Sequence, residues 1–419
     1  MTLPGNLHVE LERFSLPLSS PLETATGTID TREGFLVRLR ADDGDGEGCT
    51  DGDGDRSSAG HILGVGESTP LPGWTESLAE CESALRSVVD PEDALDVTPD
   101  DSLDDDLEDA LDVALDDDLE DALDVTLDDA LDDALDVADL GQLDPRGQDK
   151  HDGKGGSVAR RPAARHGVSL AVLDARAREA GEPLYRHLGG DRHVESVAVN
   201  ATVGDGSPEE TATAVAAAVD EGFPAVKVKV GARPLPDDLA RLRAVRERAP
   251  AVELRADANG AWDRETAARA LDALADLDVA YVEQPLPAVD LDGHAALCGR
   301  TGTAIAVDEG VIELGVDAVL DAGAADVIVC KPMALGGVDV AREVAIRARE
   351  AGVDPVVTTT VDGAVARAGA VHLAASLDLD LACGLATADR LEADLCADPA
   401  PVVDGAARVP HGKGNMPPS

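Results

Sequence analysis

Short apolar runs that each end in a charged residue recur along the second half of this 419-residue chain. Their spacing is regular, at 28, 26, 25 and 23 residues, between Lys229, Asp257, Glu283, Asp308 and Lys331. That interval fits one strand, one helix and two loops, which is the repeat of a parallel sheet or barrel. The charged side chains are therefore expected to gather at one end of the sheet.

Lysine is scarce in this chain, which makes its position informative. Six lysines stand against 29 arginines, and three of them, Lys227, Lys229 and Lys331, lie inside apolar runs. A lone lysine in a strand is usually a solvated edge residue, and a lone DAN, EQP or DEG is usually a turn. Their joint occurrence, in order and at barrel spacing, favours a functional site.

Eight candidate strands alternate with seven Ala-rich helices from residue 196 onwards. The predicted strands are SVAVNATV (196–203), AVKVKV (225–230), ELRADA (253–258), VAYVEQP (279–285), AIAVDE (304–309), DVIVCKP (326–332), DPVVTTT (354–360) and, more weakly patterned, LDLACGL (379–385). Strict alternation indicates a (β/α) barrel. The alternative is an open doubly wound sheet, which would be expected to carry GxGxxG after its first strand, and ATVGDGSPEE does not supply it.

The chain before the barrel is less regular. Residues 7–40 read as β-rich, and residues 159–190 read as an amphipathic helix followed by a short second helix. The acidic glycine-rich stretch 42–55 lacks the Gly or Glu that a calcium loop requires, so we interpret it as a solvated hairpin loop. A twelve-residue acidic repeat fills 103–138, where Leu at every fourth residue would wind around a helix. We expect that repeat to be disordered in dilute buffer and to have no catalytic role.

The net charge of -49 argues against binding to nucleic acid or to anionic membranes. Acidity with Arg in place of Lys is typical of a cytoplasmic protein from a salt-loving organism, although a nonhalophilic acidic protein with one odd insertion is an alternative. The six cysteines show no CxxC, and no apolar run approaches the roughly 20 residues that span a bilayer. A cytoplasmic location without membrane insertion is expected.

Three carboxylates at consecutive strand ends, Asp257, Glu283 and Asp308, are expected to converge on one ion. All-oxygen ligation suits Mg²⁺, with Mn²⁺ as the alternative, better than Zn²⁺. Lys227 and Lys229 alternate along one strand, so both should point inward, where each is expected to lower the pKa of the other. A lysine base on each side of a metal-bound carboxylate is the arrangement needed to remove the proton α to that carboxylate.

The motifs KVKV, DANGAW, VEQPL, AVDEG and CKPMALGG resemble the successive strand-end motifs of the enolase superfamily, specifically its muconate-lactonizing branch. The resemblance covers nearly the whole chain outside 90–157. It implies a (β/α)7β TIM-like barrel with an α+β capping domain that closes over the barrel mouth. The implied parts are 1–89 (first part of the cap), 90–157 (acidic insertion and linker), 158–193 (cap helices), 194–385 (barrel) and 386–419 (C-terminal segment returning to the cap).

The same resemblance implies roles for individual residues. Asp257, Glu283 and Asp308 would hold Mg²⁺, while Lys229 and Lys331 would act as acid and base on opposite faces of the substrate. Lys227 would tune Lys229. Residues that would contact the substrate are Arg255, Asn259, Thr358, Thr359 and Gly363; the last three lie in TTTVDGAVARAG, which departs from the usual pattern of the family.

Two further segments, GVGESTPLPGWTESLAE (64–80) and GLATADRLEADL (384–395), are similar to segments of o-succinylbenzoate synthases. The implied reaction is loss of water from a cyclohexadiene carboxylate, giving an aromatic precursor of menaquinone. N-succinylamino acid racemase, dipeptide epimerase and muconate cycloisomerase remain alternatives, because the site motifs are shared. A noncatalytic acidic cation-binding barrel is the alternative from a different class. The expected partner is a small-molecule carboxylate, and a homo-oligomer is left open.

Overall fold

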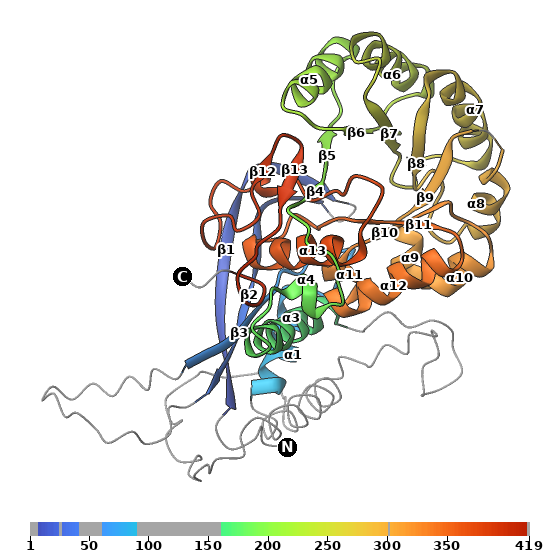
Figure 1. Cartoon of the computed structure of the whole chain (residues 1–419). Coiled ribbons are helices and arrows are strands. Elements are labelled where there is room, and N and C mark those ends of the chain that lie inside the picture. The colour runs from blue at the N-terminus through green and yellow to red at the C-terminus, as the bar shows by residue number, and fades with distance from the viewer. Residues whose placement is uncertain (1–6, 25–26, 42–60, 90–160, 301, 417–419) are drawn as a thin grey trace, which may run out of the picture.

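The computed structural model describes residues 7–24, 27–41, 61–89, 161–300 and 302–416 (Figure 1). The predicted hairpin loop at 42–55 and the acidic repeat at 103–138 lie outside these residues. None of the described helices is both long enough and apolar enough to cross a membrane.

Seven parallel strands form one curled sheet whose spatial order follows the chain (Figure 1). They are β5 (Asn200–Val203), β6 (Ala225–Lys229), β7 (Glu253–Asp257), β8 (Val279–Glu283), β9 (Ala304–Val307), β10 (Val327–Cys330) and β11 (Asp354–Val357). Apart from the edge strand β5, the strands are mostly buried, as expected of a parallel sheet that is covered on both faces. The prediction of a TIM-like barrel is confirmed.

Helices connect the successive strands on the outside of the sheet (Figure 1). They are α5 (Pro208–Asp220), α6 (Leu235–Arg248), α7 (Arg264–Leu274) with the 3₁₀ turn η2 (Ala275–Leu277), α8 (Leu291–Leu297), α9 (Glu309–Leu314), α10 (Val316–Asp321), α11 (Pro332–Leu335), α12 (Val338–Glu350) and α13 (Ala364–Leu377). Side-chain hydrogen bonds cap the N-termini of several of these helices. Ser207 and Glu210 form a reciprocal capping box at α5, and the Asp263 carboxylate accepts the Thr266 N–H at α7.

Two residues join the edges of the sheet in place of a regular eighth strand. Cys383 pairs with Val199, just before β5, and Gly384 pairs with Thr358, just after β11. The Asn200 N–H donates to the Cys383 carbonyl at 2.9 Å, and the Gly384 N–H donates to the Val357 carbonyl at 2.9 Å. The predicted eighth strand therefore exists as a short bridge that connects both edge strands.

The segment predicted as one strand at 196–203 is two strands with different partners. β4 (Ser196–Ala198) pairs antiparallel with β13 (Ala406–Arg408), which also pairs with β12 (Val402–Val403). At Val199 the chain changes partner, because its N–H donates to Gly405 whereas the next N–H donates to Cys383. The alternation of apolar residues continues through both strands, so the sequence pattern could not show the change.

A second layer is built from the N-terminal part of the chain. It comprises the antiparallel sheet β1 (Leu7–Thr24), β2 (Gly27–Ala41) and β3 (His61–Ser68), with helices α1 (Leu78–Val89), α3 (Pro162–Glu179) and α4 (Leu184–His187). The C-terminal segment, which includes η3 (Ala388–Arg390), returns to this layer (Figure 1). Leu391 bridges to Leu18, and the Asn415 N–H donates to the Asp174 carboxylate at 2.6 Å.

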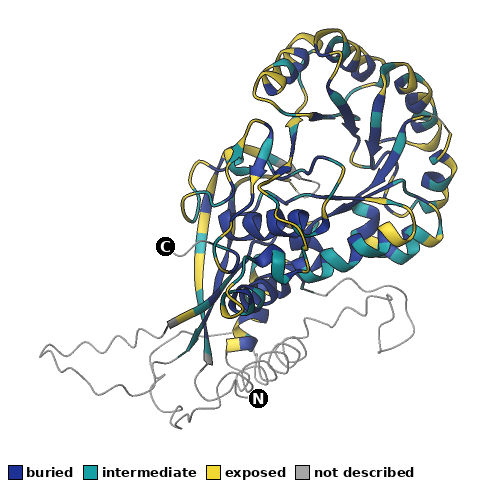
Figure 2. Ribbon diagram, viewed as in Figure 1, coloured by how far each residue is buried: buried dark blue, intermediate teal, exposed yellow. Residues whose placement is uncertain are grey.

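Helix α3 is buried on nearly every side and is not amphipathic, which corrects the prediction for residues 159–190 (Figure 2). It lies between β3 and the barrel helices α11, α12 and α13. The approach to β3 is very close: a Cβ added at Gly66 would lie 1.8 Å from the Gly167 carbonyl oxygen, and one at Gly64 would lie 2.0 Å from that of Ala171. Only glycine permits this contact between the cap sheet and the helix.

Candidate active site

The three predicted carboxylates gather at the carboxyl ends of neighbouring strands. Asp257 and Glu283 are the last residues of β7 and β8 and pair in register, while Asp308 directly follows β9. All three are at most 2 % exposed. Lys227 on β6 connects two of them, because its Nζ lies 2.8 Å from both oxygens of Glu283 and 3.2 Å from Oδ2 of Asp257.

The two other lysines lie on opposite sides of the carboxylates. Lys229 Nζ is 2.7 Å from Asp257 Oδ2 and donates to Asn259 Oδ1 at 2.7 Å. Lys331, just after β10, places its Nζ 2.5 Å from Asp308 Oδ2. Their accessibility differs, since the Lys229 side chain is 40 % exposed and that of Lys331 is 11 % exposed. The structure thus brings together all six residues predicted as metal ligands or acid/base groups.

The electrostatics of the cluster reflect crowded negative charge. Burial, followed by repulsion from Asp257, raises the pKa of Glu283 to about 7. Burial raises the pKa of Asp308 to about 6, although Lys331 opposes the shift. For Asp257 burial acts in the same direction, but Lys227 and Lys229 outweigh it and hold the pKa below its ordinary value. A divalent cation would relieve this repulsion.

The two carboxylates that face Lys227 affect its pKa. Burial alone would lower the pKa of Lys227, but Glu283 and Asp257 outweigh it and hold the pKa well above its ordinary value. The sequence pattern identified the neighbouring ammonium group but underweighted the two carboxylates that face it. These carboxylates favour the ammonium form of Lys227, and the more exposed Lys229 is the candidate base.

A hard divalent cation fits the donor set. Oδ1 of Asp308 is buried and has no hydrogen-bond partner among the described residues, and the same holds for Oε2 of the adjacent Glu309. A buried carboxylate oxygen without a partner is costly unless a ligand satisfies it. The oxygens of Asp257, Glu283 and Asp308 suit Mg²⁺ or Mn²⁺, because those ions prefer all-oxygen coordination.

Three of the predicted substrate contacts have other partners. Arg255 is fully buried inside the barrel, where it donates to the Tyr281 hydroxyl and the Ala382 carbonyl. The Gly363 N–H donates to Glu67 of β3 at 2.7 Å, and the Thr358 hydroxyl donates to the Gly384 carbonyl at 2.9 Å. These hydrogen bonds tie the three residues to the fold, and their assignment as substrate contacts stays a prediction.

Two predicted contacts remain close to the carboxyl ends of the strands. Asn259 links Lys229 to Glu309, since its amide nitrogen donates to Glu309 Oε1 at 3.0 Å. Thr359 lies beyond β11, where its hydroxyl is 2.9 Å from that of Thr387. Both remain predicted substrate contacts.

Gln284 is a positioning residue that the sequence reasoning missed. It is fully buried, and its Oε1 accepts the backbone N–H groups of Asp308 and Gly310 at 3.0 and 3.3 Å. Through these bonds the residue that follows Glu283 fixes the turn that carries the next carboxylate. The EQP motif contained the signal, because a glutamine at the end of a buried strand needs polar partners.

Trp74 is the second residue that was missed, and it connects the cap to the site. It lies in the bend between β3 and α1, where its backbone N–H donates to the Leu71 carbonyl at 2.9 Å. Lys331 Nζ lies over the Trp74 ring, 3.3 Å from the ring centroid. This contact is a cation–π interaction. The signal was a lone tryptophan after PLPG in a chain with two tryptophans, in the segment 64–80 that resembles o-succinylbenzoate synthases.

Comparison with known proteins places this geometry in a family. The model of the "Enolase C-terminal domain-like" family matches residues 210–415. The chain is 42 % identical over 220 residues to the o-succinylbenzoate synthase of Thermobifida fusca, covering 51 % of this chain and 67 % of that protein. It belongs to the enolase superfamily, in the muconate-lactonizing branch. This enolase-superfamily chain is also 27 % identical over 375 residues to the L-Ala-D/L-Glu epimerase of Bacillus subtilis, covering 88 % of this chain and 85 % of the epimerase.

Solved structures of the superfamily share the whole architecture. A substrate-liganded complex of the Bacillus subtilis L-Ala-D/L-Glu epimerase superposes with a TM-score of 0.74 at 26 % identity, covering 99 % of this chain and 98 % of that one. A dipeptide epimerase from Enterococcus faecalis, complexed with Mg and a dipeptide, gives a TM-score of 0.73 at 22 % identity, covering 98 % and 99 %. At 22 % identity, the likeness to the Enterococcus faecalis epimerase shows only that the two chains share a fold. As relatives across this branch are enzymes, the chain is an enzyme of the enolase superfamily.

Proposed function

We propose that the chain is an o-succinylbenzoate synthase, which removes water from a cyclohexadiene carboxylate. The proposal rests on sequence similarity to known o-succinylbenzoate synthases. Two o-succinylbenzoate synthases are 42 % and 38 % identical to this chain over 220 and 214 residues. Two L-Ala-D/L-Glu epimerases and a chloromuconate cycloisomerase are 27–33 % identical over 228 to 375 residues.

Lys229 is the residue we assign to proton removal. Its amine is the most exposed of the three site lysines, so it can reach a substrate above the carboxylates. Asp257 and Asn259 orient that amine at 2.7 Å each. Bound Mg²⁺ would supply positive charge beside the substrate carboxylate, which acidifies the α-proton. Asp257, Glu283 and Asp308 would hold the ion.

Lys227 and Lys331 would act as cations during this step. Lys227 keeps Glu283 and Asp257 in place, and its raised pKa favours the ammonium form. Lys331 is fixed between Asp308 and the Trp74 ring. For loss of water on one face, Lys229 removes the proton and then returns it to the departing hydroxyl. Lys331 stabilises the negative charge that develops on the substrate.

Racemisation of an N-succinylamino acid is the second candidate. The placement of Lys229 and Lys331 on opposite sides of the carboxylates supports it, because a racemase needs an amine on each face of the substrate. An N-succinylamino acid racemase of Thermus thermophilus is 32 % identical over 258 residues, covering 60 % of this chain and 68 % of that protein. The same site residues would serve both the loss of water and the racemisation.

Turnover of both substrate classes separates the candidates. The full chain would be assayed in molar KCl with Mg²⁺, since salt screens the repulsion of 84 acidic residues. Loss of diene is followed by ultraviolet absorbance, and racemisation by chiral analysis. A larger kcat/KM for the diene supports the proposal, whereas faster racemisation of an N-succinylamino acid assigns the chain as a racemase. Equal turnover by Lys229→Ala and the parent would refute proton removal by Lys229.

A further inference from the structure

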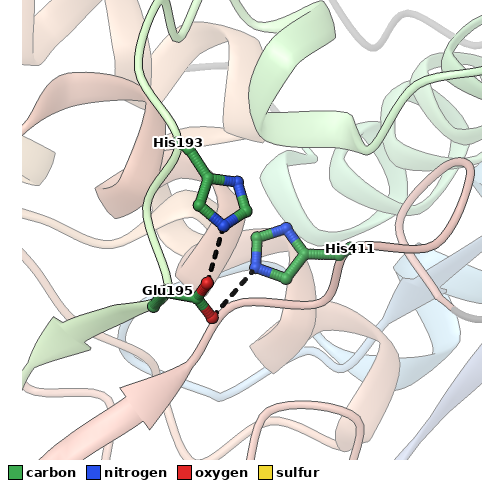
Figure 3. A group of neighbouring side chains, drawn as sticks. All are labelled: His193, Glu195 and His411. Atoms are coloured by element: carbon green, nitrogen blue, oxygen red, sulfur yellow. Dashed lines mark hydrogen bonds and ion pairs between the residues drawn. The ribbon is translucent and has the colours of Figure 1, made fainter.

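We propose a second metal site, for a borderline divalent cation such as Zn²⁺, formed by His193, Glu195 and His411. The site is separate from the carboxylates that end β7, β8 and β9. In Figure 3 the two imidazoles face one carboxylate from neighbouring segments of the chain. The metal-ligating atoms of the three residues all lie within 4.8 Å of one another.

Both imidazoles direct the same ring nitrogen towards the carboxylate. Nε2 of His193 lies 2.7 Å from Oε1 of Glu195, and Nε2 of His411 lies 3.7 Å from Oε2 (Figure 3). The two rings stack, with centroids 4.5 Å apart. A tetrahedral zinc site needs ligands at about 2.0–2.2 Å from the ion, which separates the ligand atoms by roughly 3.3 Å. The ligand atoms, which lie within 4.8 Å of one another, would approach to that separation when an ion binds.

The backbone brings these residues together without any help from their side chains. His193 and Glu195 are two positions apart on the segment that leads into β4. β4 pairs with β13 through Ser196 and Arg408, and the Val409 N–H donates to the Glu195 carbonyl at 3.1 Å. His411 lies two residues after Val409. The scaffold of the site is thus fixed before an ion binds, which lowers the entropic cost of binding.

A neighbouring aromatic ring limits the movement of His411. The Tyr185 ring meets the His411 ring edge-on, with centroids 6.0 Å apart. Tyr185 is itself buried and stacks on the buried His372. One ligand is therefore supported by the core, while His193 and Glu195 keep the freedom to adjust.

The donor chemistry selects the cation. Two imidazole nitrogens and one carboxylate match zinc and its neighbours in the transition series, whereas Mg²⁺ prefers oxygen ligands alone. Glu195 is exposed, and an exposed carboxyl is ionised at neutral pH. Both histidines must be neutral to coordinate a metal ion.

The position of the site suggests a structural role. An ion there would tie the C-terminal segment, through His411, to the segment that leads into the barrel. Because such an ion binds the folded chain, it would stabilise the fold by mass action. Among the described residues, the three ligands contact one another and not the carboxylates or lysines of the candidate active site.

The test is competition for Zn²⁺ between the full chain and a chromophoric chelator, with excess Mg²⁺ present to fill the candidate active site. The parent is expected to bind one equivalent that raises the melting temperature. Loss of a supporting second-shell partner typically costs 10–100-fold in metal affinity, so losing a direct ligand in His411→Gln or Glu195→Gln should cost at least about tenfold. Co²⁺ spectra of the parent should show nitrogen ligation that both variants lose.

His187→Gln is the matched control, because His187 also faces an acid, Glu182 at 3.4 Å, but is not part of a three-residue cluster. That variant should bind Zn²⁺ like the parent. Weak cation binding by the acidic remainder of the chain is common to all the variants and cancels in the comparison. Equal Zn²⁺ affinity in the parent and both ligand variants, or no stoichiometric binding by the parent, would overturn the proposal. If His411→Gln misfolds, Glu195→Gln decides alone.

Discussion

Removing the Trp74 ring should impair turnover through Lys331. The Nζ atom lies 3.3 Å from the ring centroid, and the lysine side chain is only 11 % exposed. Cation–π contacts contribute about 0.5–1 kcal/mol at exposed sites and about 2 kcal/mol when desolvated, so we take about 1–2 kcal/mol here. If Trp74→Leu loses that stabilisation in the transition state, kcat/KM should fall about 5- to 30-fold.

The assay compares kcat and kcat/KM of the parent, Trp74→Leu and Trp74→Phe in molar KCl with Mg²⁺. Trp74→Phe keeps an aromatic face and should retain more activity than Trp74→Leu. A purely structural role would lower the melting temperature of both variants without a selective loss of kcat, so thermal melts accompany the kinetics. Equal activity of Trp74→Leu and the parent, or equal losses in both variants, would refute the reasoning.

The remaining predictions concern the cap, the base and the insertion. Gly66→Ala should destabilise the fold by about 1–3 kcal/mol or more, since its Cβ would lie 1.8 Å from a backbone oxygen; Gly204→Ala, which meets open space, is the control in urea unfolding. Burial, then Asp362, raises the pKa of Glu67 to about 7. The folded pKa exceeds the unfolded one, so ionisation of Glu67 costs stability as the pH rises from about 4.5 to about 7. Glu67→Gln should flatten that decline in thermal melts, and an unchanged slope would contradict it. Lys229→Ala should reduce kcat by at least about 100-fold. Deleting residues 100–140 should leave turnover at high salt largely intact, and lost turnover with a retained fold would show that the insertion helps to close the pocket.

Much of the barrel could be predicted because each strand–helix repeat has a local sequence pattern. Apolar runs of strand length end in Lys229, Asp257, Glu283, Asp308 or Lys331, and a parallel barrel has one edge at which such ends can meet. Alternation also predicted that Lys227 and Lys229 point inward. Alternation could not predict how deep in the barrel each side chain lies. Arg255 points to the same side of the strand as Asp257, but it lies one layer further inside, where it contacts Tyr281 and Ala382.

What the sequence did not predict depends on partners that are distant along the chain. Glu67 accepts the Gly363 N–H across 296 residues, and Trp74 meets Lys331 only because the cap folds over the barrel. The raised pKa of Lys227 follows from two carboxylates on other strands. His411 reaches Glu195 only through the pairing of β13 with β4. None of these contacts has a periodic signature.

The central claim is that Asp257, Glu283 and Asp308 share one hard divalent ion between Lys229 and Lys331. Anomalous diffraction from crystals of the full chain equilibrated with Mn²⁺ tests it directly. The account predicts one strong peak bounded by oxygens of all three carboxylates, with the two lysine amines on opposite sides. A peak elsewhere, or no peak among these carboxylates at saturating Mn²⁺, would contradict it.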